Sequence, residues 1–363
     1  MTLFEDQFEL SSASIAEVRH WVRDRCSECQ ASDRIDLDKV EIAVGEVLQN
    51  IIRYAYSGPG PTDIRVCDLA ECVSITVFDQ AAPNPIDQWT VQPEGTDGGF
   101  GLNLIKECSD AHRFRAIDSG NRCSLYFFAD PEGLPVESLL WAGELLEAEV
   151  TDESMSDWCK WSLSTVLAES DFLVLRAAID TVESFENSSA RVPEYHNLAH
   201  FRDVVITVCH VIETHWLELS REEVLGTVLA AILHDFGHPG RKASYPGEFE
   251  DATVDRVLDF FERGGEECGE QARSLCLALI RGTSPAFGEA PNELQRIFNV
   301  CDKGASFIPW HGPALASLLC AELGEPDALE LWRAFVINSA TDFQRAPRFI
   351  RSWYRRCKYL CIR

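Results

Sequence analysis

The chain of 363 residues lacks the features of membrane-embedded and exported proteins. No apolar run approaches the roughly 20 residues that a membrane-spanning helix needs. The opening segment, MTLFEDQFEL, has no basic stretch followed by an apolar one, which is the pattern of a secretory leader. Both absences predict a cytoplasmic protein without membrane attachment. The length allows two or three domains, and a hydrophobic content of 46% is typical of globular ones.

Positive charge is also scarce. Lys and Arg number 32 against 59 Asp and Glu, so the formal net charge is −27. A surface of that sign repels phosphates, which argues against direct nucleic-acid binding. Only the segment 345–363 departs from this balance, with seven basic residues and no acidic one. It is either a helix whose charges complement an acidic body or a site for a phosphate or a partner.

Closely spaced cysteine pairs are rare, because the 14 cysteines are scattered along the chain. Without a leader peptide, reduced thiols are expected rather than a disulfide framework. Cys26 and Cys29 form the one CxxC pair. They could supply half of a zinc site, but no second CxxC completes it.

Residues 1–130 alternate helical and extended patterns, with a Gly- and Pro-rich segment at 57–63. Their apolar periodicity predicts an α+β sandwich in which helices cover one sheet. The expected helices are 13–30, 40–55 and one that starts at 99; the expected strands are 64–67, 73–78 and 123–128.

Residues 131–160 begin with PEGLP and continue through an acidic stretch, so we expect a helical linker that spaces two domains or mediates a homodimer. Residues 161–363 contain no convincing strand pattern and predict an all-α domain. Its expected helices are 160–185, 198–217, 221–235, 249–263, 267–281, 291–304, 312–321 and 326–340.

Histidines and acids concentrate in two short segments of this second half. His196 and His200 lie in YHNLAH, while His234, Asp235 and His238 lie in HDFGHPG. Asp302 follows near the end of a later apolar helix. Divalent metals need such mixed nitrogen and oxygen ligands. Two metals can activate water and neutralise a phosphodiester, and a nearby imidazole can protonate the leaving alkoxide.

These segments resemble the HD-superfamily phosphohydrolases, and within them the 3',5'-cyclic-nucleotide phosphodiesterases. That family carries YHNxxHxxDV, then HDxxHPG, then Asp; this chain reads YHNLAHFRDV at 195–204, HDFGHPG at 234–240, and Asp302. The resemblance covers roughly residues 160–360. It implies Zn²⁺ together with Mg²⁺ or Mn²⁺, His196 as general acid, and His238 as a residue that positions metal-bound water. The metal ligands that it implies are His200, His234, Asp235 and Asp302.

Two parts of the family pattern differ in this chain. The acidic, His-rich segment expected after HPG is replaced by GEFEDATVDRV, where Glu248 or Glu250 is the candidate substitute. The purine-reading glutamine and its aromatic clamp are represented by Gln344 and Phe349. The resemblance implies cAMP, cGMP or a related phosphoester as substrate.

The first half contains a second group of chemically informative residues. Glu46 and Asn50 lie four residues apart on one helix, where the pair could hold Mg²⁺ and a water or simply form a solvated face. Asp79 ends a strand. The glycines Gly99 and Gly101 open a helix, where backbone N–H groups can approach phosphates, although such a segment is often only a turn.

In this order the elements resemble the Bergerat-fold (GHKL) ATPases, and most closely the anti-sigma-factor serine kinases. The matching segments are EVLQNIIRYAY, DQAAPNP, GGFGL and Asn121. The resemblance implies ATP–Mg²⁺ as cofactor, with Asn50 on Mg²⁺, Asp79 on adenine, and Gly99 and Gly101 at the phosphates. It implies Glu46 as the base that activates a partner's serine. Ala81 replaces the usual glycine of the DxG motif, and Tyr54 replaces the usual histidine.

Together the two resemblances predict a bacterial signalling enzyme. Its first domain binds ATP and phosphorylates or sequesters a protein partner, such as a sigma factor or an anti-anti-sigma protein. Its second domain hydrolyses a cyclic nucleotide. The alternative is a partner-switching binding module whose HD domain acts on or senses another phosphoester.

Overall fold

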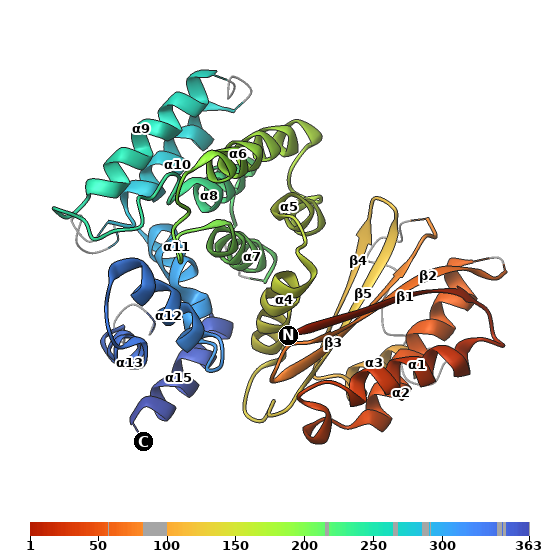
Figure 1. The fold of residues 1–363 in the computed structure, drawn as a ribbon. Helices are drawn as coiled ribbons and strands as arrows, with labels where there is room; N and C mark the ends of the chain where they lie inside the picture. The colour runs from red at the N-terminus through yellow and green to blue at the C-terminus, as the bar shows by residue number, and fades with distance from the viewer. Residues whose placement is uncertain are drawn as a thin grey trace. The chain divides into compact units, whose positions relative to one another are not determined.

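The computed structural model describes residues 1–56, 58–82, 100–214, 218–263, 268–284, 290, 292–339, 343 and 346–362. The chain divides into two compact units, Met1–Asp152 and Glu153–Arg363. The first contains a sheet and helices, and the second is helical in its described part (Figure 1). The predicted fold class, an α+β sandwich followed by an all-α domain, is therefore confirmed.

The N-terminal unit is built on a five-stranded antiparallel sheet of order β1-β2-β3-β5-β4. Its register places Asp79, the last residue of β3, opposite Asn121 on β5. The pairing therefore brings together two residues that are 42 positions apart in the sequence. The strands are β1 (Thr2–Leu10), β2 (Gly60–Asp68), β3 (Cys72–Asp79), β4 (Ala111–Ile117) and β5 (Gly120–Phe128).

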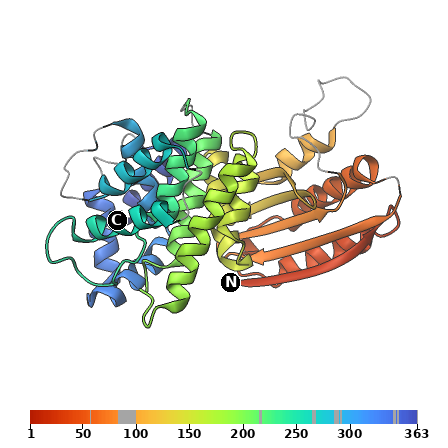
Figure 2. The ribbon, with the colours of Figure 1, turned by 90° about the horizontal axis from the view of Figure 1, so that it is seen from above.

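Three helices cover one face of this sheet: α1 (Ile15–Ser27), α2 (Leu37–Asn50) and α3 (Phe100–Cys108) (Figure 2). Asp36 caps α2 by accepting the backbone N–H groups of Asp38 and Lys39. A π-helical turn, Ile51–Ala55, continues α2. The core under these helices includes Val44, Leu48, Ile64, Ile75 and Leu125, all fully buried.

Cys26 and Cys29 lie in this core. Burial is the main cause that raises the pKa of both thiols, that of Cys29 to about 12. Both side chains therefore remain neutral thiols that pack as small apolar groups, and thiols in that form are poor metal ligands.

The three predicted strands lie within β2, β3 and β5, whereas β1 and β4 were not predicted. In β1 the charges of Glu5 and Asp6 interrupt the apolar alternation, and most of its residues are exposed at the sheet edge. In β4, Arg113 and Arg115 occupy positions that a half-buried strand usually fills with apolar side chains. Neither strand has a regular apolar alternation in its sequence, because each carries charged side chains that form ion pairs in the fold.

The other face of the sheet carries helix α4 (Val136–Thr151), which packs on β4, β5, β3 and β1. Alternation along the strands turns Thr76, Ser124 and Tyr126 away from the helices α1–α3 and toward α4. Glu147 on α4 accepts hydrogen bonds from the Thr76 hydroxyl and, at 2.5 Å, from the Tyr126 hydroxyl. Its carboxylate also pairs with Arg122 at 3.1 Å.

A second glutamate fixes the same helix. Glu144 accepts from Arg115 Nη1 at 2.7 Å and from Arg113 Nε at 3.2 Å, with 1% of its side chain exposed. The preceding residue must be small, because a Cβ on Gly143 would lie 2.4 Å from the Tyr126 ring. Helix α4 thus fits this sheet through specific charges and one close backbone contact.

The predicted linker 131–160 is consequently divided between the two units. Helix α4 belongs to the N-terminal unit, which ends at Asp152. The next helix, α5, begins at Met155 in the C-terminal unit, with Ser154 as its N-cap. The acidic residues that suggest a solvated connector include Glu144 and Glu147, which are buried against arginines.

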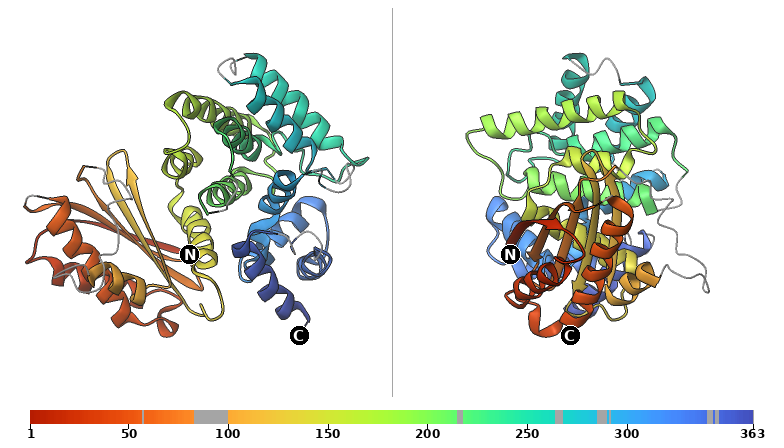
Figure 3. Two further views of the ribbon diagram at one scale, coloured as in Figure 1. Left: turned by 180° about the vertical axis from the view of Figure 1, so that it is seen from behind. Right: turned by 90° about the vertical axis from the view of Figure 1, so that its right-hand side faces the viewer.

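The C-terminal unit is a set of packed helices (Figure 3). The predicted helix 160–185 is two helices, because the chain breaks after Leu163 and restarts at Glu169, where Asp171 accepts the Ala168 N–H and pairs with Arg221. The helices are α5 (Met155–Leu163), α6 (Glu169–Ser188), α7 (Leu198–Thr214), α8 (Arg221–Leu233), α9 (Glu248–Arg263), α10 (Glu270–Arg281), α11 (Glu293–Lys303), α12 (Gly312–Leu323), α13 (Ala328–Asn338) and α15 (Arg348–Ile362).

The basic tail of the sequence forms α15, which is amphipathic. Its apolar side, including Ile350, Trp353 and Cys357, is fully buried, while Arg348 and Arg355 are exposed. Within the described ranges, no helix combines the length and the apolar content needed to cross a membrane.

The buried charges predict how α4 is held. Replacing Glu147 by Ala removes the carboxylate that pairs with Arg122 and accepts from two hydroxyl groups, so the N-terminal unit should lose about 3 kcal/mol of stability. Hydrogen exchange measured by mass spectrometry should then accelerate across residues 136–151. Glu137→Ala, at an exposed position of the same helix, is the matched control; equal protection in both variants would contradict this role.

Candidate functional site

The first site segment, YHNLAH, is shaped by a helix N-terminus. Asn197 caps α7, because its side-chain oxygen accepts the backbone N–H groups of Ala199 and His200 at 2.9 and 3.3 Å. Its amide group donates to the Glu194 carbonyl at 2.8 Å, which fixes the entering chain. The cap therefore fixes the direction in which the His200 side chain points from the first turn of α7, and 5% of that side chain is exposed.

The second segment, HDFGHPG, ends an apolar helix. Helix α8 runs to Leu233, and His234 follows at its C-cap position. Gly237 and Gly240 have φ values of +75° and +63°, a region that side chains with a Cβ rarely adopt. The positive φ values at these two glycines let the chain turn sharply directly after α8. His234, Asp235 and His238 therefore stay close together.

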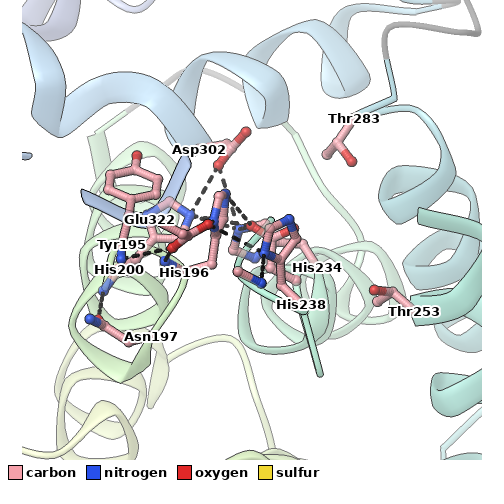
Figure 4. Close-up of polar contacts among 12 residues, drawn as sticks. Tyr195, His196, Asn197, His200, His234, His238, Thr253, Thr283, Asp302 and Glu322 are labelled. Carbon is pink, nitrogen blue, oxygen red and sulfur yellow. Dashed lines mark hydrogen bonds and ion pairs between the residues drawn. The ribbon is translucent and has the colours of Figure 1, made fainter. Parts of the chain in front are cut away.

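Four side chains, from α7, from α11 and from the segment that follows α8, converge on one point (Figure 4). His234 Nε2 lies 3.1 Å from His200 Nε2, 3.1 Å from Asp235 Oδ2 and 3.5 Å from Asp302 Oδ1. His200 Nε2 lies 3.4 Å from Asp302 Oδ1 and 3.5 Å from Asp235 Oδ2. All four residues implied as metal ligands are thus brought together by the fold.

The chemistry of this cluster fits a divalent cation. The Nδ1 of His234 lies 3.0 Å from the Ala231 carbonyl, which can only accept, so Nδ1 carries a proton and Nε2 is the nitrogen that faces the cluster and is available to a metal once deprotonated. Burial alone would lower the pKa of His234, but Asp235 and Asp302 outweigh it and raise the pKa to about 10. Two carboxylates thus make the point favourable for positive charge, and nitrogen with oxygen is a donor set that Zn²⁺ accepts.

His196 lies beside the cluster and is held by a residue that was not predicted. Its Nδ1–H donates to Glu322 Oε1 at 2.5 Å, and Glu322 Oε2 accepts the backbone N–H groups of Tyr195 and His196 at 2.9 and 3.2 Å. The other ring nitrogen, Nε2, lies 4.0 Å from Asp235 Oδ2. His196 therefore presents Nε2 to the cluster while Glu322 fixes its ring and tautomer.

Glu322 remains ionised near neutral pH. Burial would raise the pKa of this carboxyl, but its hydrogen bonds with His196 and the two backbone N–H groups lower the pKa to about 2. A sequence signal for this residue exists in retrospect. Within α12, GPALASLLCAEL, Glu322 is the one charged residue, and a lone acid in an apolar helix indicates a buried partner.

His238 contacts the general-acid candidate rather than the four-residue cluster. Its ring contacts that of His196 at a tilt of 31° with the centroids 3.8 Å apart, and its Nδ1 accepts the Gly240 N–H at 3.2 Å. Burial and then the charge of His196 lower the pKa of His238 to about 4. His238 is thus a neutral ring near pH 7, and it is 3.6 Å from Glu322 Oε1.

The two candidate substitutes for the family's missing segment have different surroundings. Glu248 pairs with Arg241 and accepts the Ser244 N–H, so its carboxylate is already occupied. Glu250 lines the cavity next to the cluster, where burial raises the pKa of its carboxyl. Of the two, Glu250 is the one that can face a bound ion or water.

Of the two predicted substrate residues, Phe349 does not line this cavity. Gln344 lies outside the described residues. Phe349 is 3% exposed and packs edge-on against His210, with the ring centroids 4.6 Å apart, because it belongs to the buried side of α15. The cavity has a volume of about 320 Å³, and its lining includes Tyr195, His196, Asp235, Glu250 and Asp302 from the polar side.

In the N-terminal unit, α2 and α3 bring three predicted residues together. A Cβ built on Gly101 would lie 2.7 Å from Glu46 Oε2 and 3.5 Å from the Asn50 amide atoms. Glycine at position 101 therefore leaves room for the side chains of Glu46 and Asn50 beside the start of α3. Gly99 lies outside the described residues.

Asp79 lies at the end of β3 with one oxygen engaged. Its Oδ1 accepts from Asn121 Nδ2 at 2.9 Å and from the Ala81 N–H at 3.0 Å. Burial raises the pKa of this carboxyl, and the bonds from Asn121 and Ala81 oppose that rise. The opposing turn needs Gly120, whose φ is +149°, because a Cβ there would lie 1.8 Å from the Asp79 carbonyl oxygen.

Comparison with known families finds one match in each of the two units. Residues 8–127 match the model of the histidine kinase-like ATPase domain, and residues 195–255 match that of the 3'5'-cyclic nucleotide phosphodiesterases. No curated protein matches the chain. The predicted fusion of an ATPase-type domain with a phosphodiesterase-type domain is confirmed.

The convergent cluster predicts a specific loss of metal. Removal of one direct ligand, in His234→Ala or Asp302→Asn, should weaken binding of Zn²⁺ or Mn²⁺ at least about a hundredfold, beyond the effect of losing an outer-shell partner. Metal content after equilibrium dialysis, measured by mass spectrometry, checks this. His20→Ala, whose ring is 76% exposed on α1, is the control. Unchanged stoichiometry in the cluster variants would rule out a metal at this point.

Proposed function

We propose that the C-terminal unit hydrolyses 3',5'-cyclic nucleotides, cAMP or cGMP, and that the N-terminal unit binds ATP and regulates a partner protein. The observation that carries the first part is the juxtaposition of two features. A four-residue nitrogen and oxygen cluster lies beside an imidazole that is held by a carboxylate, and Nε2 of that imidazole is 4.0 Å from Asp235.

A divalent ion held by His200, His234, Asp235 and Asp302 would lower the pKa of a water and neutralise the phosphoryl oxygens of the substrate. Zn²⁺ suits these four ligands, and Glu250, which lines the same cavity, would help to hold a second ion, Mg²⁺ or Mn²⁺. His200 and His234 would orient the ion, and the carboxylates would compensate its charge.

His196 would supply the proton for the leaving alkoxide. Its Nδ1–H is committed to Glu322, so any further proton is on Nε2, the nitrogen that faces the cluster. Ionised Glu322 stabilises the protonated ring, as a carboxylate next to imidazole does in other general acids. When Nε2 gives its proton to the ribose oxygen, Glu322 still holds the neutral ring in the same orientation.

For the N-terminal unit, we propose that ATP–Mg²⁺ binds at Asn50, Asp79, Gly99 and Gly101. Asp79 Oδ1 is occupied by Asn121 and Ala81, and its second oxygen can accept from the adenine amino group. Glu46 next to Gly101 would be the base that activates a serine hydroxyl of a protein of the anti-anti-sigma type. The support is the approach of Glu46, Asn50 and Gly101 in one corner of the unit.

The role of the His196–Glu322 pair is tested by two variants of the metal-loaded chain. His196→Ala should lower kcat for cyclic-nucleotide hydrolysis about 100- to 10,000-fold, because the leaving alkoxide loses its acid. Glu322→Gln should lower kcat by a smaller factor while KM stays unchanged, because it acts through His196. Glu325→Gln, on an exposed ion pair three residues on, is the control. Wild-type protein inert on both cyclic nucleotides would overturn the proposal.

The adenine site has a separate test. Asp79→Ala should weaken ATP binding at least about tenfold and abolish the preference for ATP over GTP, since the buried acceptor for the adenine amino group is lost. Isothermal titration calorimetry of the full chain with Mg²⁺ measures both quantities. Asp33→Ala, at a position outside this corner, should bind like the wild type. A variant that keeps both affinity and preference would contradict the assignment.

A further inference from the structure

The cavity beside the metal cluster has a polar end and an apolar end. The polar end holds the candidate metal ligands and His196. The apolar end is formed by residues of α12 and α13, two helices that pack on each other. Flat aromatic and branched aliphatic side chains of this kind suit a planar base, but they supply no hydrogen bond to it. They are Leu315, Ala316 and Leu319 from α12 and Leu331, Trp332 and Phe335 from α13.

Most polar groups toward this end already have partners. Trp332 Nε1–H donates to the Ser306 carbonyl at 2.8 Å, a contact that requires glycine at 312, since a Cβ there would lie 2.4 Å from Nε1. The Ser306 hydroxyl is engaged with the Tyr195 side chain. Thr283 donates its hydroxyl hydrogen to the Ile280 carbonyl at 2.8 Å. The side-chain donors of Trp332 and Thr283 are therefore not free for a base.

Lys303 is the exception. It is the last residue of α11, it is half-buried, and it lines the cavity. Its ammonium group forms no ion pair with any residue in the described part of the chain, and it is the one lysine or arginine among the described residues of the lining, whose acids are Asp235, Glu250 and Asp302. An ammonium group has three N–H donors and no acceptor.

Two simpler roles for Lys303 leave this arrangement unexplained. A cation at a helix C-terminus is mildly stabilising, but that effect is equally available to an exposed side chain and does not require a place in a cavity wall. A contact with the substrate phosphate is the second role. The phosphate is already served by the metal cluster and by His196, which form the polar end.

Guanine and adenine differ in the hydrogen-bond acceptors that they present to an ammonium group, which can only donate. Guanine presents two adjacent acceptors, O6 and N7, and lysine binds this pair in nucleic-acid recognition. Adenine presents N7 next to an amino group, whose hydrogens oppose an ammonium group. A cavity with an unpaired lysine among its described lining residues should therefore discriminate between the two purines.

We infer that Lys303 selects guanine, so that cGMP is the preferred substrate of the C-terminal unit. This rests on the proposed hydrolysis of cyclic nucleotides at the same site. The base lies at the apolar end between the α12 and α13 side chains, and the Lys303 ammonium group donates to O6 and N7 from the end of α11. Lys303 is thus a specificity-determining residue, and it takes no part in the proton transfer.

The experiment compares kcat/KM for cGMP and cAMP in the metal-loaded full chain. The wild type should prefer cGMP about tenfold, the value of one charged contact to a base edge. Lys303→Met keeps the length of the side chain and removes its donors, so it should lose the preference through a lower value for cGMP alone. Lys303→Arg, which can donate to both acceptors, should retain it. Lys358→Met on α15 is the control lysine.

Three outcomes would overturn the inference: a wild type without preference for cGMP, an equal loss for both substrates in Lys303→Met, or no change in that variant. Equal loss at normal metal content would assign Lys303 to the phosphate instead. Calorimetric binding of 5'-GMP and 5'-AMP supplies a readout that needs no turnover. A wild type that binds GMP more tightly through Lys303 yet hydrolyses neither cyclic nucleotide would support the selection of guanine by Lys303 and refute the proposed function, and with it cGMP as a substrate.

Discussion

Carboxylates that are partly buried beside imidazoles are unfavourable unless positive charge compensates them, and the C-terminal unit is organised around this constraint. Asp235 and Asp302 arrive from different helices and meet His200 and His234 within hydrogen-bonding distance. Each helix end is shaped to deliver its residue, by the Asn197 cap on α7 and by the glycine turns after α8. The same cavity then continues from this charged point to an apolar wall, so that one opening can hold a phosphate and a base.

The N-terminal unit meets the same physical problem in a different way. Its buried acids, Glu144 and Glu147, are compensated by arginines of the sheet and by hydroxyl groups. Ion pairs of this kind contribute little net stability compared with an apolar interface, but they tolerate few alternative arrangements. They therefore determine where α4 docks and in what register, and they make this helix part of the ATPase-type unit.

Much of the fold and of the candidate site could be predicted from the sequence, for reasons that are local. Strands β2, β3 and β5 are rich in apolar residues, and the histidine motifs keep their ligands within a few residues of a helix end. Residues whose role depends on a distant partner could not be predicted. Glu322 meets His196 across 126 residues, and Glu147 meets Thr76 across 71. Phe349 was predicted from its motif to clamp the base, but it lies on the apolar side of α15, which packs in the core against His210.

The hydrogen bond from His234 Nδ1 to the carbonyl of Ala231 has a consequence for how this site can evolve. The group that determines the tautomer of a metal-binding candidate belongs to the backbone of α8, and every amino acid that keeps the helix supplies the same carbonyl. No substitution at position 231 that preserves the helix can remove it. His196 differs, because its tautomer depends on the side chain of Glu322, which a single mutation can delete. The tautomer of His234 is therefore insensitive to substitution of the residue that fixes it. The orientation of His196, the candidate proton donor, must instead be maintained by selection on Glu322.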